Sequence, residues 1–173
     1  MKIAIIGQGY VGLPLSMAAA KSGHQVIGID LDEKLVAALN SGVSTISDIS
    51  NEEIAANSKN YKATSDFKEL SGVEIIAICV PTPLDSDQKP DNSFLIHALK
   101  SVAENMDENS LVIIESTISP GTTRGLAQEI LNESGKKFEL AYSPERIDPA
   151  NKNWNITNTP KLVAGLSQSA TEK

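Results

Sequence analysis

The first thirty residues, MKIAIIGQGYVGLPLSMAAAKSGHQVIGID (Met1–Asp30), place a glycine-rich turn between two short apolar runs. Gly7, Gly9 and Gly12 lie where the first run gives way to a segment of small residues. In a dinucleotide-binding unit, the first glycine of GxGxxG permits a tight turn, the second admits a pyrophosphate, and the third lets helix and strand pack closely. The following helix offers free N–H groups to the phosphates. Such glycines could also serve packing alone, so the pattern needs further support.

Asp30 supplies that support, because it ends the second apolar run 21 residues after Gly9. An acid there can accept both ribose hydroxyls of an adenosine. A carboxylate would repel a 2′-phosphate, and Leu31 rather than an arginine follows it, so the sequence favours NAD over NADP. The alternative role for Asp30 is to cap a helix beginning near Asp32. Lys34 is a candidate for the adenosine side of the site, or else a solvated helix lysine.

Short apolar runs alternate with helical patterns along the rest of the chain. The predicted strands are Lys2–Ile6, Gln25–Asp30, Val73–Val80, Leu111–Ser116 and Phe138–Ser143, with shorter candidates at Tyr61–Thr64 and Lys161–Gly165. The predicted helices are Leu13–Ser22, Glu33–Asn40, Ser93–Asn105 and Thr122–Glu133. This alternation predicts an α/β fold, a Rossmann-like doubly wound and mostly parallel sheet with helices on both faces.

Two details of this pattern are specific enough to test. The third helix is expected to have Ser93 as its N-cap and an apolar face made by Phe94, Ile96, Leu99, Val102 and Met106. The polar stretch Val43–Asn60 is expected to form loops or short helices.

Composition narrows the function classes. The chain has 173 residues, a net charge of −7 and one cysteine, Cys79. The acidic balance argues against broad nucleic-acid binding, and no apolar run approaches the roughly 20 residues of a membrane span. With a single cysteine there is no intramolecular disulfide, and the expected location is the cytoplasm. We expect a dinucleotide-binding domain over residues 1–165 and the start of a further helix over 166–173, as in a piece of a longer protein.

Three later motifs follow predicted strands: ICVPTPLDSDQKPDNS, ESTISPGTT and AYSPERIDP, which begin at Ile78, Glu115 and Ala141. Together with the opening stretch, they resemble the UDP-glucose/GDP-mannose dehydrogenase family. The resemblance covers Met1 to about Gly165. The extended forms of the motifs look most like the branch that acts on UDP-N-acetyl-D-glucosamine or UDP-N-acetyl-D-mannosamine, in polysaccharide biosynthesis.

The resemblance implies an enzyme that oxidises the C6 alcohol of a UDP-sugar to a carboxylate with two NAD. In the family a cysteine traps the aldehyde and water hydrolyses the resulting thioester. That cysteine lies beyond the segment present here, and Cys79 does not match it, so this chain alone is expected to be inactive. The full-length protein is expected to be a homo-oligomer with a UDP-sugar as its partner, without nucleic acid or membrane.

The site residues are carried over by position. The cofactor-binding candidates are Gly7, Gly9, Tyr10, Val11, Gly12, Asp30, Lys34, Val80, Pro81, Thr82, Ser116 and Thr117. The catalytic candidates are Glu145 and Thr117, and the substrate-binding candidates are Glu145, Arg146 and Ile147. No metal cluster is visible.

Each of the main candidates also has a structural alternative. Thr82 could be a turn hydroxyl, and Ser116 with Thr117 could cap the next helix. Glu115 could contact the cofactor or be an ordinary strand-end carboxylate. Glu145 is expected to activate the hydrolytic water, or else to form a salt bridge with Arg146.

Two other functions stay open on the sequence. One is a β-hydroxyacid-type dehydrogenase with a similar first domain, although SPER after the fifth strand has no obvious reason there. The other is a non-catalytic module that senses NAD. The sequence does not distinguish the glucosamine from the mannosamine epimer.

Overall fold

The computed structural model describes residues 1–146, 156 and 158–173. In this part of the chain, seven strands form one sheet in the order β3-β2-β1-β4-β5-β6-β7, and only β7 runs antiparallel to its neighbour. The strands are β1 (Lys2–Ile6), β2 (Gln25–Ile29), β3 (Tyr61–Thr64), β4 (Ile75–Ile78), β5 (Ser110–Ile114), β6 (Phe138–Tyr142) and β7 (Ala164–Gly165). This confirms the predicted doubly wound sheet, whose order reverses between β1 and β4.

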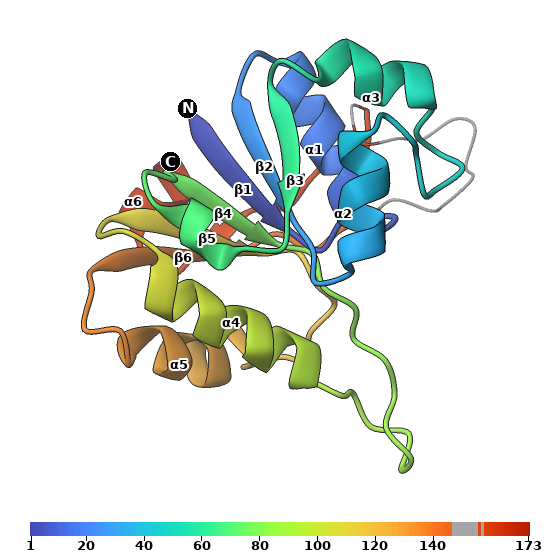
Figure 1. Ribbon diagram of the computed structural model, residues 1–173. Helices are drawn as coiled ribbons and strands as arrows, with labels where there is room; N and C mark the ends of the chain where they lie inside the picture. Colours follow the sequence, from blue (N-terminus) through green and yellow to red (C-terminus); the bar gives the residue numbers. More distant parts are fainter. Residues whose placement is uncertain (147–155, 157) are drawn as a thin grey trace.

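Helices cover both faces of the sheet. They are α1 (Gly12–Lys21), α2 (Glu33–Asn40), α3 (Asn51–Asn57), α4 (Ser93–Asn105), α5 (Gln128–Asn132) and α6 (Gln168–Glu172), with a 3₁₀ turn η1 (Phe67–Leu70) and a π-helical turn η2 (Thr123–Ala127). Figure 1 shows α4 and α5 on one face and α1, α2 and α3 on the other. Within the described residues, no helix is long and apolar enough to cross a membrane.

The side chains of β1 explain why both faces are covered. Ala4 and Ile6 point into the core beneath α4 and α5, whereas Ile5 packs against Leu13 and Met17 of α1. All three β1 residues are at most 3% exposed. A strand that is apolar on both faces can be stable only when helices shield both of them.

Strand register brings the carboxyl ends of the strands level. Ile29, Ile6, Ile78, Ile114 and Tyr142 are successive partners across the sheet. The residues that follow them therefore form the next row, in the order Asp30, Gly7, Cys79, Glu115 and Ser143. The sequence-based strands extended into this row; in the structure the strands end before it, and its residues are free to face a ligand.

Helix α4 differs from its prediction at its first turn. Its N-cap is Asn92 rather than Ser93, and the Ser93 N–H donates to Asp91 Oδ1 at 2.8 Å. Phe94 is 49% exposed, while Leu95 is 1% exposed. The buried stripe is Leu95, Ala98, Leu99, Val102, Ala103 and Met106, with Ile96 half-buried beside it. The first turn extends past the sheet edge, so Phe94 was wrongly placed in the core.

Two further segments refine the predicted elements. The stretch Val43–Asn60 contains one short helix, α3, as expected of loops or short helices. The predicted helix Thr122–Glu133 is instead the π-helical turn η2 followed by α5.

Candidate functional site

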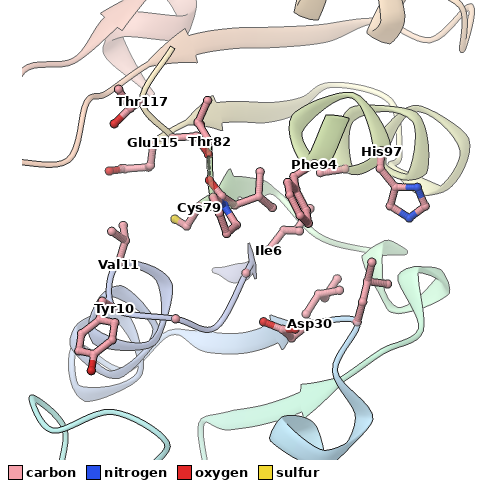
Figure 2. Close-up of a pocket in the computed structure, with 18 of the residues that line it drawn as sticks. Ile6, Tyr10, Val11, Asp30, Cys79, Thr82, Phe94, His97, Glu115 and Thr117 are labelled. Atoms are coloured by element: carbon pink, nitrogen blue, oxygen red, sulfur yellow. Dashed lines mark hydrogen bonds between the residues drawn. The ribbon is translucent and has the colours of Figure 1, made fainter. Parts of the chain in front are cut away.

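A cleft of about 820 Å³ runs along the carboxyl edge of the sheet. It is lined by the turn after β1, the ends of β2, β4 and β5, the first turns of α4, and Glu145. Figure 2 shows Asp30 at one end of this cleft and Glu115 with Thr117 at the other. Asp30 and Glu115 are three strand spacings apart, which is about 14 Å.

The three motif glycines have different surroundings. Gly7 has a φ of +88°, and a Cβ on it would lie 2.6 Å from the carbonyl oxygen of Cys79. A Cβ on Gly12 would lie 1.8 Å from the carbonyl oxygen of Gly7. A Cβ on Gly9 would meet no atom within 4 Å, and Gly9 lines the cleft. Gly7 and Gly12 are thus required by the turn and its packing, and Gly9 leaves space above it.

Asp30 is held in place by two backbone N–H groups. Gln8 N donates to Asp30 Oδ2 at 2.8 Å, and Asp32 N donates to Asp30 Oδ1 at 3.0 Å. Asp32, not Asp30, is the N-cap of α2, since its side chain accepts from Lys34 N and Leu35 N. Each Asp30 oxygen keeps a lone pair for a ribose hydroxyl.

Gln8, which the sequence analysis did not single out, supports the glycine turn from below. It is fully buried, and its amide nitrogen donates to Ile5 O at 2.8 Å. Its amide oxygen accepts from Ser16 Oγ at 3.0 Å and from Tyr61 Oη at 2.9 Å. A polar residue inside a glycine motif is a weak sequence signal, because nothing local shows that it points inward.

The far end of the cleft is lined by polar groups from the turns after β4 and β5. Ser116 is buried and donates its hydroxyl proton to Val80 O at 2.8 Å, so its hydroxyl ties the two turns together. Thr82 Oγ1 is buried and has no hydrogen-bond partner among the described residues. Thr117 is exposed at the cleft wall.

A buried ionic cluster stands behind this end. Lys161 Nζ lies 2.5 Å from Glu115 Oε2 and 3.2 Å from Glu145 Oε2. Burial raises the pKa of Glu115, although Lys161 opposes the shift. For Lys161, burial alone would lower the pKa, but contact with the two carboxylates outweighs it and raises the pKa. The sequence gave no sign of Lys161.

These features fit a dinucleotide. The cleft has a carboxylate for a ribose at one end, an open glycine in the middle and an unsatisfied hydroxyl, Thr82 Oγ1, at the other. No side chain caps the N-terminus of α1, and its first turn has no acid, which leaves that helix end available to phosphates.

The sequence profile described as "UDP-glucose/GDP-mannose dehydrogenase family, NAD binding domain" matches residues 1–173. The chain belongs to the UDP-glucose/GDP-mannose dehydrogenase family. It is the family's NAD-binding domain, which confirms the resemblance and NAD as the cofactor.

Relatives within the family are similar over nearly the whole chain. UDP-N-acetyl-D-mannosamine dehydrogenase of Pyrococcus horikoshii is 38% identical over 98% of this chain and 42% of its own length. UDP-N-acetyl-D-glucosamine 6-dehydrogenase of Salmonella typhi is 36% identical over 99% of this chain and 41% of its own length. The chain thus spans about two fifths of the length of these relatives.

Solved structures of the family share the fold. The UDP-D-ManNAc dehydrogenase structure from Pyrococcus horikoshii superposes with a TM-score of 0.88 at 38% identity, covering 99% of this chain and 43% of that one. An NDP-N-acetyl-D-galactosaminuronic acid dehydrogenase from Methanosarcina mazei gives a TM-score of 0.89 at 30% identity, covering 99% of this chain and 40% of that one.

The structure brings most of the family's expected site residues together. Gly7, Gly9, Tyr10, Val11, Asp30, Val80, Pro81, Thr82, Ser116, Thr117 and Glu145 all line the cleft. Gly12 lies beneath it, and Lys34 is exposed and outside the lining. Ile147 lies outside the described residues.

Arg146 and Glu145 do not form the salt bridge that was the alternative reading. Arg146 Nη1 donates to Pro160 O at 3.3 Å, and the Arg146 backbone N–H donates to Glu145 Oε1 at 2.6 Å. The cation at Glu145 is Lys161. Arg146 is exposed and is not part of the cleft lining.

Cys79 lies one residue past β4 and lines the cleft, whereas the sequence placed it inside a buried strand. Burial, reinforced by the charge of Glu115, raises the pKa of its thiol. A raised pKa keeps the unreactive thiol form at neutral pH. Its position corrects the prediction of a core residue, but its chemistry is not that of a nucleophile.

Proposed function

We propose that this chain is the cofactor-binding part of an enzyme that oxidises the C6 alcohol of a UDP-N-acetylhexosamine to a uronate. The names of the relatives at 36–38% identity support this substrate class. The reaction consumes one alcohol, two NAD⁺ and one water, and yields one carboxylate, two NADH and three protons. NAD serves as the hydride acceptor.

The cleft residues would divide the cofactor between them. Asp30 would accept the adenosine ribose hydroxyls, and the backbone beside Gly9 would meet the pyrophosphate. Thr82 and Thr117 would face the nicotinamide half, since they lie at the opposite end of the cleft from Asp30.

Glu145 is the observation that carries the catalytic part of the proposal. Its carboxylate lines the same end of the cleft as Thr117, with its side chain 8% exposed and Lys161 beside it. A carboxylate so placed can accept a proton from the water that hydrolyses a thioester. The resemblance puts the cysteine that bears this thioester in the part of the relatives that this chain does not span.

The test is Glu145→Gln in the full-length enzyme. Glutamine keeps the shape of the side chain but cannot act as a base, and general-base help is typically about 10²–10⁴-fold. Turnover should fall by about that factor, while up to two NADH per site form in a first burst. A covalent sugar adduct should then appear as a mass increase on the intact protein. Glu129→Gln, an exposed change on α5, is the matched control.

Two outcomes would contradict this role. Near-normal turnover without an adduct would leave Glu145 as a structural partner of Lys161. Loss of the first hydride transfer would make it a residue that positions substrate or cofactor.

We further propose that the full-length enzyme is a cytoplasmic homo-oligomer. A single cysteine suits a reducing compartment. Size-exclusion chromatography with light scattering would measure its assembly, and a monomer would contradict the proposal.

A further inference from the structure

The charges around the cleft are unusual for a site that binds an anion. Among its described lining residues there is no lysine and no arginine, but there are three carboxylates, those of Asp30, Glu115 and Glu145. Asp30 has a clear use at the ribose end. Glu115 and Glu145 both lie at the far end, where no phosphate is expected.

We propose that the cluster of Glu115, Glu145 and Lys161 biases the cleft toward the oxidised form of its cofactor. The oxidised nicotinamide ring carries a positive charge and the reduced ring is neutral, while the rest of the two molecules is the same. A negative group beside the ring therefore favours NAD⁺ over NADH. This inference rests on the proposed placement of the nicotinamide at the far end of the cleft.

That placement follows from the fold. Asp30 ends β2, in the first half of the sheet, and Glu115 follows β5, in the second half. A dinucleotide binds across the point where the strand order reverses, with one nucleotide in each half. With adenosine at Asp30 and the pyrophosphate at Gly9, the nicotinamide comes to the ends of β4 and β5, beside Glu115.

The cluster presents its negative side to the cleft. Glu115 and Glu145 line the cleft, whereas Lys161 contacts both carboxylates and is not among the lining residues. Two carboxylates and one ammonium leave a net charge of about −1. The carboxylate side chains are 6% and 8% exposed, so solvent screens this charge less than it would at the surface.

The expected effect can be bounded by Coulomb's law. A unit charge about 6 Å from the ring, in a medium of effective dielectric about 40–80, changes the affinity for a charged ring by about three- to tenfold. Neutralising either carboxylate should lower the ratio of NAD⁺ to NADH affinity by that factor.

The experiment is a calorimetric titration of this chain with NAD⁺, NADH and ADP-ribose, for the wild type, Glu145→Gln and Glu115→Gln. ADP-ribose lacks the nicotinamide and reports whether the rest of the cleft is intact. Glu129→Gln removes the same formal charge from exposed α5 and controls for the change in net charge.

We expect both cluster variants to lower the NAD⁺/NADH affinity ratio by about three- to tenfold with unchanged ADP-ribose affinity, and Glu129→Gln to leave the ratio alone. An unchanged ratio in a variant that still binds ADP-ribose would overturn the inference. Loss of ADP-ribose binding in both variants would also overturn it, because the cluster would then be structural. A shifted ratio together with normal turnover in Glu145→Gln would keep this inference while refuting the proposed base.

Discussion

At the residue scale, Gly9 and Gly12 show one residue type used for two purposes three positions apart. Gly12 is buried, and a Cβ on it would collide with the Gly7 carbonyl at 1.8 Å, whereas the space above Gly9 is empty. The sequence pattern predicts both glycines, but it assigns their separate roles only by analogy. The structure separates them by what surrounds each.

We therefore expect alanine at the two positions to have opposite effects. Gly12→Ala should lower the free energy of unfolding by about 1–3 kcal/mol, since backbone must move. Gly9→Ala should stay within about 0.5 kcal/mol of the wild type but weaken NAD binding at least about tenfold, which is about 1.4 kcal/mol. Urea unfolding and calorimetry measure the two quantities. A destabilised Gly9→Ala with normal NAD affinity would contradict this assignment.

Sequence reasoning reached Asp30 and Glu145 because each follows a recognisable strand. It missed Lys161, whose partners lie 46 residues away at Glu115 and 16 residues away at Glu145. The contact forms because the chain returns antiparallel to β6 through β7, and a two-residue strand leaves almost no pattern. The site was predictable where function follows strand ends, and not where it depends on a distant crossing.

At the element scale, the turn between β1 and α1 depends on a buried hydrogen-bond network centred on Gln8. Its amide oxygen accepts from Ser16 on α1 and Tyr61 on β3, and its backbone N–H positions Asp30. The network thus joins two strands and a helix beneath the candidate ribose and phosphate positions. Local sequence patterns cannot reveal it, because β3 pairs with β2 and reaches Gln8 only through the folded sheet.

Mutating this network should show coupling. Tyr61→Phe and Ser16→Ala should each cost about 1 kcal/mol, and the double variant should cost about 1–3 kcal/mol more than their sum because the buried amide oxygen loses both donors. Urea unfolding measures all four proteins, with Ser22→Ala at the exposed end of α1 as control. Simple additivity would contradict the network.

The same variant has a pH signature. Burial raises the pKa of Tyr61 above its ordinary value of 10.0, so the folded state holds this proton where the unfolded state releases it. The unfolding free energy should therefore fall as pH rises above about 10. This Tyr61 contribution should be missing in Tyr61→Phe.

Element boundaries show the limit of periodicity. The predicted α4 contained the correct apolar spacing, but Phe94 faces the cleft because the first turn overhangs the sheet edge. The π-helical turn before α5 likewise leaves no distinct pattern. Interior packing was predictable from spacing, and the turns at the sheet edge were not.

At the scale of the whole molecule, the alternation of apolar runs and helical patterns determined the sheet, since parallel strands buried on both faces need helices between them. The strand order itself followed only from the dinucleotide motif and its resemblance. The chain carries a net charge of −7, and its cleft has carboxylates but no described lysine or arginine in its lining. Binding of an anionic cofactor must therefore depend on backbone N–H groups and on Asp30, which selects against a further phosphate.

Calorimetric titration of this chain with NAD and with NADP tests that account most directly. Asp30 is fixed by two backbone donors, so it cannot turn away from a 2′-phosphate without breaking them. We predict that NAD binds clearly more tightly than NADP, and that Asp30→Ala weakens NAD by about 1–3 kcal/mol while removing the discrimination. Equal or tighter binding of NADP by the wild-type chain would contradict the assignment of this cleft.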